Sequence, residues 1–201
     1  MSNCLIYDFE TLSKNPENCV VLCFAALSFN EDRYIDDPYT FSELVSNANM
    51  IKFDVEEQVR LYKRKIQGDT LEWWNSQNGD VRQILKPSPK DRRLSDIFTF
   101  FDYVAAGKRL DRVFTRGNTF DPIILQSICK NHFNLQRPYD WWLDRDTRSF
   151  IEGLSYGSGL KNNFFPETVN HDEFIHHNPI HDISLDVMRM QLLVRLVSGV
   201  E

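Results

Sequence analysis

The sequence contains few cysteines, and none of them are spaced as a metal-binding or redox pair. The four cysteines, Cys4, Cys19, Cys23 and Cys129, include no Cys-x-x-Cys motif. A chain of 201 residues can bury enough apolar surface to fold without disulfide bonds. We therefore expect four reduced thiols, as in a cytosolic protein.

Long hydrophobic runs and an excess of positive charge are also missing. No apolar stretch approaches the roughly 20 residues of a membrane-spanning helix, and the N-terminus lacks the basic and apolar segments of a signal peptide. The formal net charge of −6 excludes a uniformly basic nucleic-acid-binding protein, but not a nucleic-acid enzyme, because local charge governs binding. No repeat, low-complexity tract or Gly/Ser linker divides the chain, so we expect one domain over residues 1–201.

Charge is distributed unevenly along the chain. Residues 1–51 carry a net charge of −6 and residues 117–201 carry −4, whereas residues 52–116 carry +4. Each basic run alone is typical of a solvated helix face. Together the runs would attract a phosphate backbone. The runs comprise Arg60, Lys63, Arg64, Lys65, Lys86, Lys90, Arg92, Arg93, Lys108, Arg109, Arg112 and Arg116.

Hydrophobic patterning predicts an α/β fold with a mixed central β-sheet flanked by helices. Strands are expected over residues 4–9, 19–29 and 112–115, with a further strand near a sheet edge over 33–41. Helices are expected over residues 55–65, 70–77, 95–106, 120–132 and 183–197, and a proline-containing loop over 86–90.

Two carboxylates lie at the end of the first predicted strand. Asp8 and Glu10 are two residues apart, so they share one face of that strand. Carboxylates held side by side repel each other unless a cation compensates, and Mg²⁺ prefers oxygen ligands. The alternative is a polar strand end that faces water, because Asp-x-Glu alone is a common pattern.

Two further aspartates lie at positions that favour a binding site. Asp121 falls between a predicted strand and a helix, where Pro122 makes it a natural N-cap, although ligand sites also gather at such strand ends. Asp186 shares the inward face of the last predicted helix with Ile183 and Met190. A buried carboxylate there requires a partner or a metal ion. The alternative for Asp186 is a helix-dipole interaction near the helix N-terminus.

Four histidines fall between residues 171 and 181, which raises the alternative of a zinc site. No cysteine lies nearby, and Pro179 disfavours one continuous helix that carries both His177 and His181. We favour His181 as a single general base, with the other histidines solvated.

Taken in chain order, Asp-x-Glu on the first strand, Asn-x-Phe-Asp after a middle strand and His-x-x-x-x-Asp near the last helix resemble the motifs of the DEDDh group of 3′→5′ exonucleases. These enzymes have an RNase H-like fold. The resemblance is closest to phage DexA-type exonucleases and their bacterial exoribonuclease-like relatives, on residues 8–11, 69–74 and 145–148. One departure is Ile183, which stands where the group often has alanine. The matching residues are Asp8, Glu10, Asp121 in Asn-x-Phe-Asp, His181 and Asp186.

The resemblance implies a cytoplasmic enzyme (in the host cytoplasm if the chain is of phage origin) that releases nucleoside 5′-monophosphates from single-stranded DNA. It implies two Mg²⁺ or Mn²⁺ ions held by the four carboxylates, with His181 as the general base. In each of the pairs Trp73–Trp74 and Trp141–Trp142, one ring is expected in the core and the other free, because adjacent residues face different ways. The expected substrate contacts are Phe9, Thr11, Trp73, Trp74, Asn118, Phe120 and Arg148.

Three alternatives remain open from the sequence. The first is an exoribonuclease of the same fold, because discrimination by the 2′-hydroxyl depends on local contacts. The second is a non-catalytic nucleic-acid-binding protein, and the third is an unrelated domain whose acidic residues are caps and surface charges. The oligomeric state is also open, a homodimer included.

Overall fold

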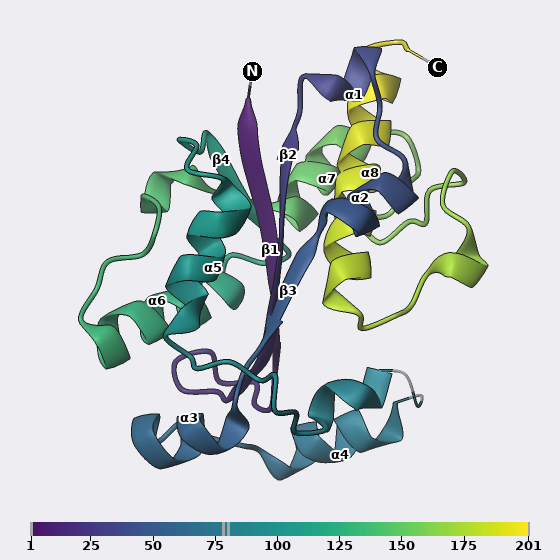
Figure 1. The fold of residues 1–201 in the computed structure, drawn as a ribbon. Coiled ribbons are helices and arrows are strands. Elements are labelled where there is room, and N and C mark those ends of the chain that lie inside the picture. Colours follow the sequence, from purple (N-terminus) through teal and green to yellow (C-terminus); the bar gives the residue numbers. More distant parts are fainter. Residues whose placement is uncertain (1, 78, 80, 201) are drawn as a thin grey trace.

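A mixed five-stranded sheet forms the centre of the molecule, as predicted (Figure 1). The computed structural model describes all residues except 1, 78, 80 and 201. The strand order is β3-β2-β1-β4-β5. Strand β1 pairs antiparallel with β2 and parallel with β4, while β2–β3 is antiparallel and β4–β5 parallel. The strands are β1 (Asn3–Thr11), β2 (Val21–Asn30), β3 (Asn49–Lys52), β4 (Arg112–Thr115) and β5 (Asp144–Asp146).

Helices cover both faces of this sheet (Figure 1). Leu5, Tyr7 and Phe9 of β1 pack in the core beneath α5 and α6, whereas Cys4 and Ile6 pack beneath α8. Because side chains alternate along a strand, Asp8 and Glu10 lie on the α8 face. The helices are α1 (Arg33–Asp36), α2 (Phe41–Asn47), α3 (Val55–Tyr62), α4 (Gly68–Ser76), α5 (Asp96–Ala105), α6 (Asp121–Phe133), α7 (Thr147–Ser155) and α8 (Pro179–Val197).

The strand expected over residues 33–41 was a wrong prediction. Helix α1 occupies its first part, and Pro38, which lacks a backbone N–H, lies in the connection to α2. Tyr34 and Phe41, which lie in this range, are buried in a cluster with apolar residues of α8 and do not belong to the sheet. The edge strand is instead β3, which the pattern did not reveal, and β5 and α7 were also missed. Helix α8 begins at Pro179, four residues earlier than expected.

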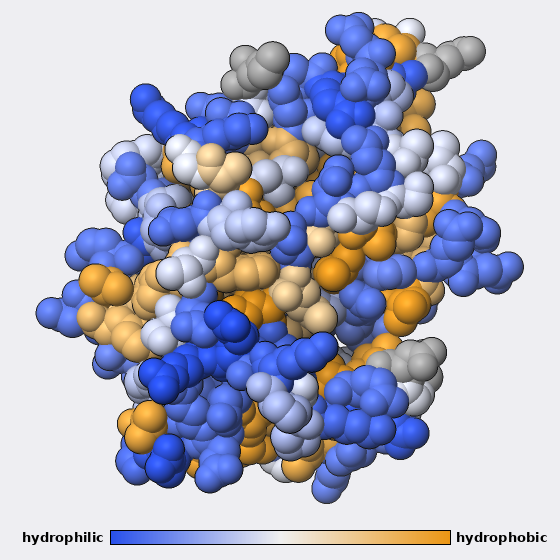
Figure 2. Space-filling view, in the orientation of Figure 1, coloured by the Kyte–Doolittle hydropathy of each residue, from blue (hydrophilic) through white to orange (hydrophobic). Residues whose placement is uncertain are grey.

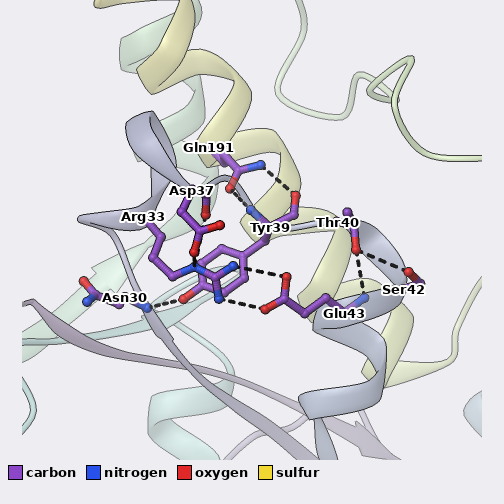
Figure 3. A network of polar contacts seen from close by, with 8 residues as sticks. All are labelled: Asn30, Arg33, Asp37, Tyr39, Thr40, Ser42, Glu43 and Gln191. Carbon is purple, nitrogen blue, oxygen red and sulfur yellow. Dashed lines mark hydrogen bonds and ion pairs between the residues drawn. The ribbon is translucent and has the colours of Figure 1, made fainter.

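A network of polar contacts ties the α1–α2 connection to α8 (Figure 3). The Tyr39 N–H donates to Gln191 Oε1 at 2.8 Å, and Gln191 Nε2 donates to the Tyr39 carbonyl at 3.0 Å. The Arg33 guanidinium stacks on the Tyr39 ring at 3.8 Å and forms a two-pronged bond with Glu43. These contacts fix the α1–α2 connection against α8. No helix in the described part of the chain is long and apolar enough to cross a membrane.

Replacing Gln191 with leucine is expected to destabilise the protein. The substitution keeps the approximate shape of the side chain but leaves the buried N–H and C=O of Tyr39 unpaired, at about 1–3 kcal/mol each. Urea unfolding of Gln191→Leu and of the exposed control Gln136→Leu measures the difference. Equal unfolding midpoints for the two variants would contradict this role.

Candidate active site

The two carboxylates of β1 lie at its carboxyl end, facing the first turn of α8. Burial raises the pKa of Asp8 well above its usual range, and the nearby charges of Asp121 and Glu10 raise it further. Burial also raises the pKa of Glu10, with Asp182 as its strongest charged neighbour and Asp121 next. Each of these groups is therefore held where its charged form is unfavourable.

Asp121 is the first residue of α6 and lies beside β1. Its side chain is 3% exposed, and Oδ1 accepts a hydrogen bond from the Phe9 N–H at 3.2 Å. Burial raises the pKa of Asp121 to about 7, against the lowering effect of its backbone hydrogen bonds and of Arg148. The N-cap interpretation of Asp121 was wrong, because Phe120 occupies the cap position and the carboxylate is bonded across to β1.

A fourth carboxylate, which the sequence did not single out, belongs to Asp182 on the first turn of α8. Burial raises the pKa of Asp182 to about 7, and the charge of Asp186 raises it further, while Arg189 and Arg116 lower it. Asp182 raises the pKa of both Asp8 and Glu10. Its position completes a group of four mutually repelling carboxylates.

These four carboxylates line one cavity of about 510 Å³ at the carboxyl end of β1. In Figure 1 this is the end of the central strand opposite the N-terminus. Its other lining residues include His176, His177 and Asp186, the cations Arg116, Arg148 and Arg189, and the aromatic residues Phe9, Phe120, Phe165 and Phe174.

His177, and not His181, lines this cavity. His177 immediately precedes the N-cap of α8 and has a left-handed backbone with φ of 61°, which is uncommon for a residue other than glycine. Its ring packs edge to face against the Trp73 ring, with 4.8 Å between the ring centroids. Burial lowers the pKa of His177, and the charge of His176 lowers it further. His181 Nδ1 instead accepts the Ile175 N–H at 3.2 Å, and its ring packs against Phe41.

Asp186 also lines the cavity, and its charge raises the pKa of Asp8 and Asp182, but its carboxylate is engaged by cations. It is 1% exposed and accepts hydrogen bonds from Arg116 Nη1 at 2.5 Å, Arg189 Nη1 at 2.7 Å and Thr147 Oγ1 at 2.6 Å. The same two arginines donate to carbonyl groups of the segment before α8, on Asn162, Asn163 and Phe164. Asp186 thus organises an arginine cluster that fixes one wall of the cavity.

The His-x-x-x-x-Asp motif occurs twice in the sequence, and the two occurrences overlap. His177 with Asp182 and His181 with Asp186 are both five residues apart. Pro179 begins α8, because proline favours the first turn of a helix, so Asp182 lies in the first turn and Asp186 one turn later.

The other expected substrate residues divide into two groups. Phe9, Phe120 and Arg148 line the cavity. Trp73 is 41% exposed beside His177, whereas Trp74 is buried and donates its Nε1–H to the Thr11 carbonyl at 2.8 Å. This pair has one core and one free ring as expected, but Trp141 and Trp142 are both exposed. Thr11 and Asn118 do not line the cavity. Asn118 Oδ1 instead accepts a hydrogen bond from the Thr115 hydroxyl.

The donor chemistry of the cavity suits a hard divalent cation. Within the described residues, no three His, Cys, Asp or Glu side chains are gathered tightly enough to form a complete metal site. Four carboxylates nevertheless line one hollow, and their pKa values are raised by burial and mutual repulsion. A cation among their oxygen atoms would relieve that repulsion, so the residues fit Mg²⁺ or Mn²⁺.

Asp182→Asn and Asp186→Asn are expected to change stability in opposite directions at pH 8 without divalent ions. Asp182→Asn removes a repelled carboxylate and should raise the melting temperature. Asp186→Asn leaves two arginines without their shared anion and should cost about 3–5 kcal/mol. Thermal unfolding in EDTA measures both variants, and shifts of the same sign would contradict the different roles of the two residues.

The metal-free protein is expected to lose stability as the pH rises. A carboxyl whose pKa is raised in the folded state stabilises the fold below its unfolded pKa near 4, and that contribution is lost as the pH rises through the folded value. For Asp121 and Asp182 the folded value is about 7. Melting temperatures in EDTA should fall between pH 5 and 8, and Mg²⁺ should restore more stability at pH 8 than at pH 5. An equal Mg²⁺ effect at both pH values would contradict this prediction.

Known proteins share both the sequence and the fold of this chain. Residues 3–191 match the family described as the 3′-5′ exoribonuclease Rv2179c-like domain. The exodeoxyribonuclease of Enterobacteria phage T4 is 32% identical over 216 residues, which cover 98% of this chain and 91% of the phage protein.

Solved structures of exonuclease I have a similar fold at low sequence identity. A product-bound form aligns over 99% of this chain with a TM-score of 0.56 and 13% identity. A zinc-bound complex of the E. coli enzyme with single-stranded DNA gives a TM-score of 0.57 and 15% identity. This chain spans less than half of exonuclease I, 44% and 41% in these two structures. The chain therefore belongs to the 3′-5′ exoribonuclease Rv2179c-like family, and it is a 3′→5′ exonuclease with an RNase H-like fold.

Proposed function

We propose that this protein is a divalent-metal-dependent exonuclease that removes nucleoside 5′-monophosphates from the 3′ end of single-stranded DNA, in one domain that spans residues 1–201. The observation that carries the proposal is the gathering of Asp8, Glu10, Asp121 and Asp182 around one cavity that His177 also lines. No ordinary structural role explains four repelling carboxylates in one hollow, because their mutual repulsion weakens the fold.

In this proposal the four carboxylates hold two Mg²⁺ or Mn²⁺ ions. When bound, the ions supply Lewis acidity to the attacking water and to the leaving 3′ oxygen. His177 takes the proton of that water, since its lowered pKa keeps the imidazole neutral and able to accept it. The bond between phosphorus and the 3′ oxygen breaks, so the phosphate leaves on the released nucleotide as a 5′-monophosphate.

His177 replaces His181 as the proposed general base for a geometric reason. His181 already accepts a hydrogen bond from the Ile175 N–H and packs among aromatic rings outside the cavity, whereas His177 lines the cavity together with the carboxylates. Asp182 likewise replaces Asp186 as the fourth ligand, since Asp186 is already neutralised by Arg116 and Arg189.

DNA is favoured over RNA by the comparisons. The phage T4 relative, which aligns over nearly its whole length, is named an exodeoxyribonuclease, and an exonuclease I structure of similar fold holds single-stranded DNA. The family description names an exoribonuclease, which supports RNA as the second candidate substrate.

Histidine variants test the proposed general base. His177→Ala should lower kcat at least about 100-fold, the lower end of what a general base contributes. His181→Phe keeps a ring among its aromatic neighbours and should change kcat far less. The measurement is stepwise shortening of a 5′-labelled strand with Mg²⁺. A larger loss in His181→Phe than in His177→Ala would reverse the assignment.

The same assay separates the remaining alternatives. Matched DNA and RNA strands identify the substrate, and faster shortening of RNA would replace DNA in the proposal. Asp8→Asn should abolish cleavage while the variant stays folded, since that carboxylate is proposed as a metal ligand. Binding of the labelled strand without any cleavage by the wild-type protein would instead support a non-catalytic nucleic-acid-binding protein.

A further inference from the structure

Two further hollows continue from the catalytic cavity along one side of the molecule. The first, of about 260 Å³, shares His177 with the catalytic cavity. The second, of about 510 Å³, shares Met50 and Lys52 of the edge strand β3 with the first. His177 thus borders both the catalytic cavity and the first hollow, and Met50 and Lys52 border both further hollows, so the hollows follow one another from the carboxylates past His177 and over β3 to α5. We call the two further hollows the groove.

The part of the groove next to the catalytic cavity is mostly apolar. Ile84, Ile175 and Pro179 line it together with Met50 and Val81. Apolar surfaces of this kind accept the faces of unstacked bases without selecting among them. The exposed Trp73 ring packs edge to face against the ring of His177, which borders this part of the groove.

The far part of the groove combines basic and aromatic side chains. Lys52, Lys90 and Arg92 lie along it, and all three belong to the basic middle section of the sequence. Two acidic residues in this hollow, Asp91 and Asp96, pair with Lys52 and Arg92. The lining therefore keeps one net positive charge, to which Lys90 contributes.

Tyr103 supplies an aromatic surface at the end of this groove. It is on α5, lines the same hollow as Lys90, and is 69% exposed. Figure 2 shows the face on which β3 and α5 lie, where hydrophilic and hydrophobic side chains are interleaved. Alternating cations and aromatic rings are the surface chemistry that binds single-stranded nucleic acid.

We propose that this groove binds the part of the single-stranded substrate that lies 5′ to the nucleotide being removed. The inference rests on the proposed function, because the occupant enters the groove from the catalytic cavity. Bases adjacent to the cleaved nucleotide lie against the apolar section, and phosphates farther along meet Lys90 and its neighbours over β3. The groove therefore makes binding depend on strand length without affecting the chemical step.

The test compares a long and a short substrate in the Lys90→Ala/Tyr103→Ala double variant. For a 15-nucleotide DNA strand, KM should rise at least about fivefold, the effect of losing one base–aromatic stack at the low end of 1–3 kcal/mol. The slope of log KM against log salt should fall in magnitude by about 0.7, which corresponds to one lost phosphate contact. For a dinucleotide, kcat and KM should stay unchanged, because its two nucleotides end at the apolar section and do not reach Lys90 or Tyr103 in the far hollow.

A matched control is Lys130→Ala/Tyr156→Ala, which removes one exposed lysine and one exposed tyrosine outside the groove. This control should leave both substrates unaffected. Unchanged KM for the long strand in the groove variant, or equal losses on both substrates, would overturn the groove while leaving the proposed function standing. Absence of cleavage of either substrate by the wild-type protein would overturn the proposed function, and the groove with it.

Discussion

The repulsion between buried carboxylates is the constraint on which the rest of the structure depends. Asp8, Glu10 and Asp121 lie against the centre of the sheet, where burial makes each charge costly and each neighbour makes it costlier. The protein keeps them there because β1 is fixed on both sides, by β2 and β4, and on both faces by packed helices. The apolar contacts of β1 thus offset a destabilisation that arises from side chains of the same strand.

Cations arranged around the carboxylates limit this repulsion without removing it. Arg116 and Arg189 lie close enough to lower the pKa of Asp182, yet both are bonded to Asp186. Asp186 therefore keeps the guanidinium groups from closing onto the cavity carboxylates. The cavity is thus lined both by carboxylates and by the guanidinium groups of Arg116, Arg148 and Arg189, an arrangement suited first to a cation and then to a phosphate.

The sequence predicted the fold well because most helices and strands show one clear hydrophobic pattern, either an apolar run or a helical period. Residues 4–9 and 112–115 are apolar strands in sequence and in structure, and the helix expected over residues 95–106 is α5, Asp96–Ala105. The prediction failed where tertiary contacts decide the local structure. Strand β3 has only four residues, and within the range 33–41 Tyr34 and Tyr39 are buried in the cluster that α8 contributes to.

The candidate site was predicted in part for a similar reason. Asp8, Glu10, Asp121 and Asp186 were all expected at one site and all line one cavity, because strand alternation, strand ends and helix faces have simple geometry. The sequence did not single out Asp182 or His177, which line the same cavity and have the same five-residue separation as His181 and Asp186. It also did not reveal that Asp186 bonds to two arginines. Arg116 and Asp186 are 70 residues apart, so no local pattern reveals their contact.

Helix α8 performs a different task on successive turns. Asp182 faces the cavity, Asp186 holds the arginine cluster, and Gln191 bonds to Tyr39. A residue inserted between them would rotate everything beyond it by about 100°, because an α-helix has 3.6 residues per turn. The length of this segment is therefore fixed, whereas the connection between α7 and α8 can change in length away from the carbonyl groups that bind the arginines and from the residues that line the cavity. Among related chains, insertions and deletions should accumulate in that connection and be absent between residues 182 and 191.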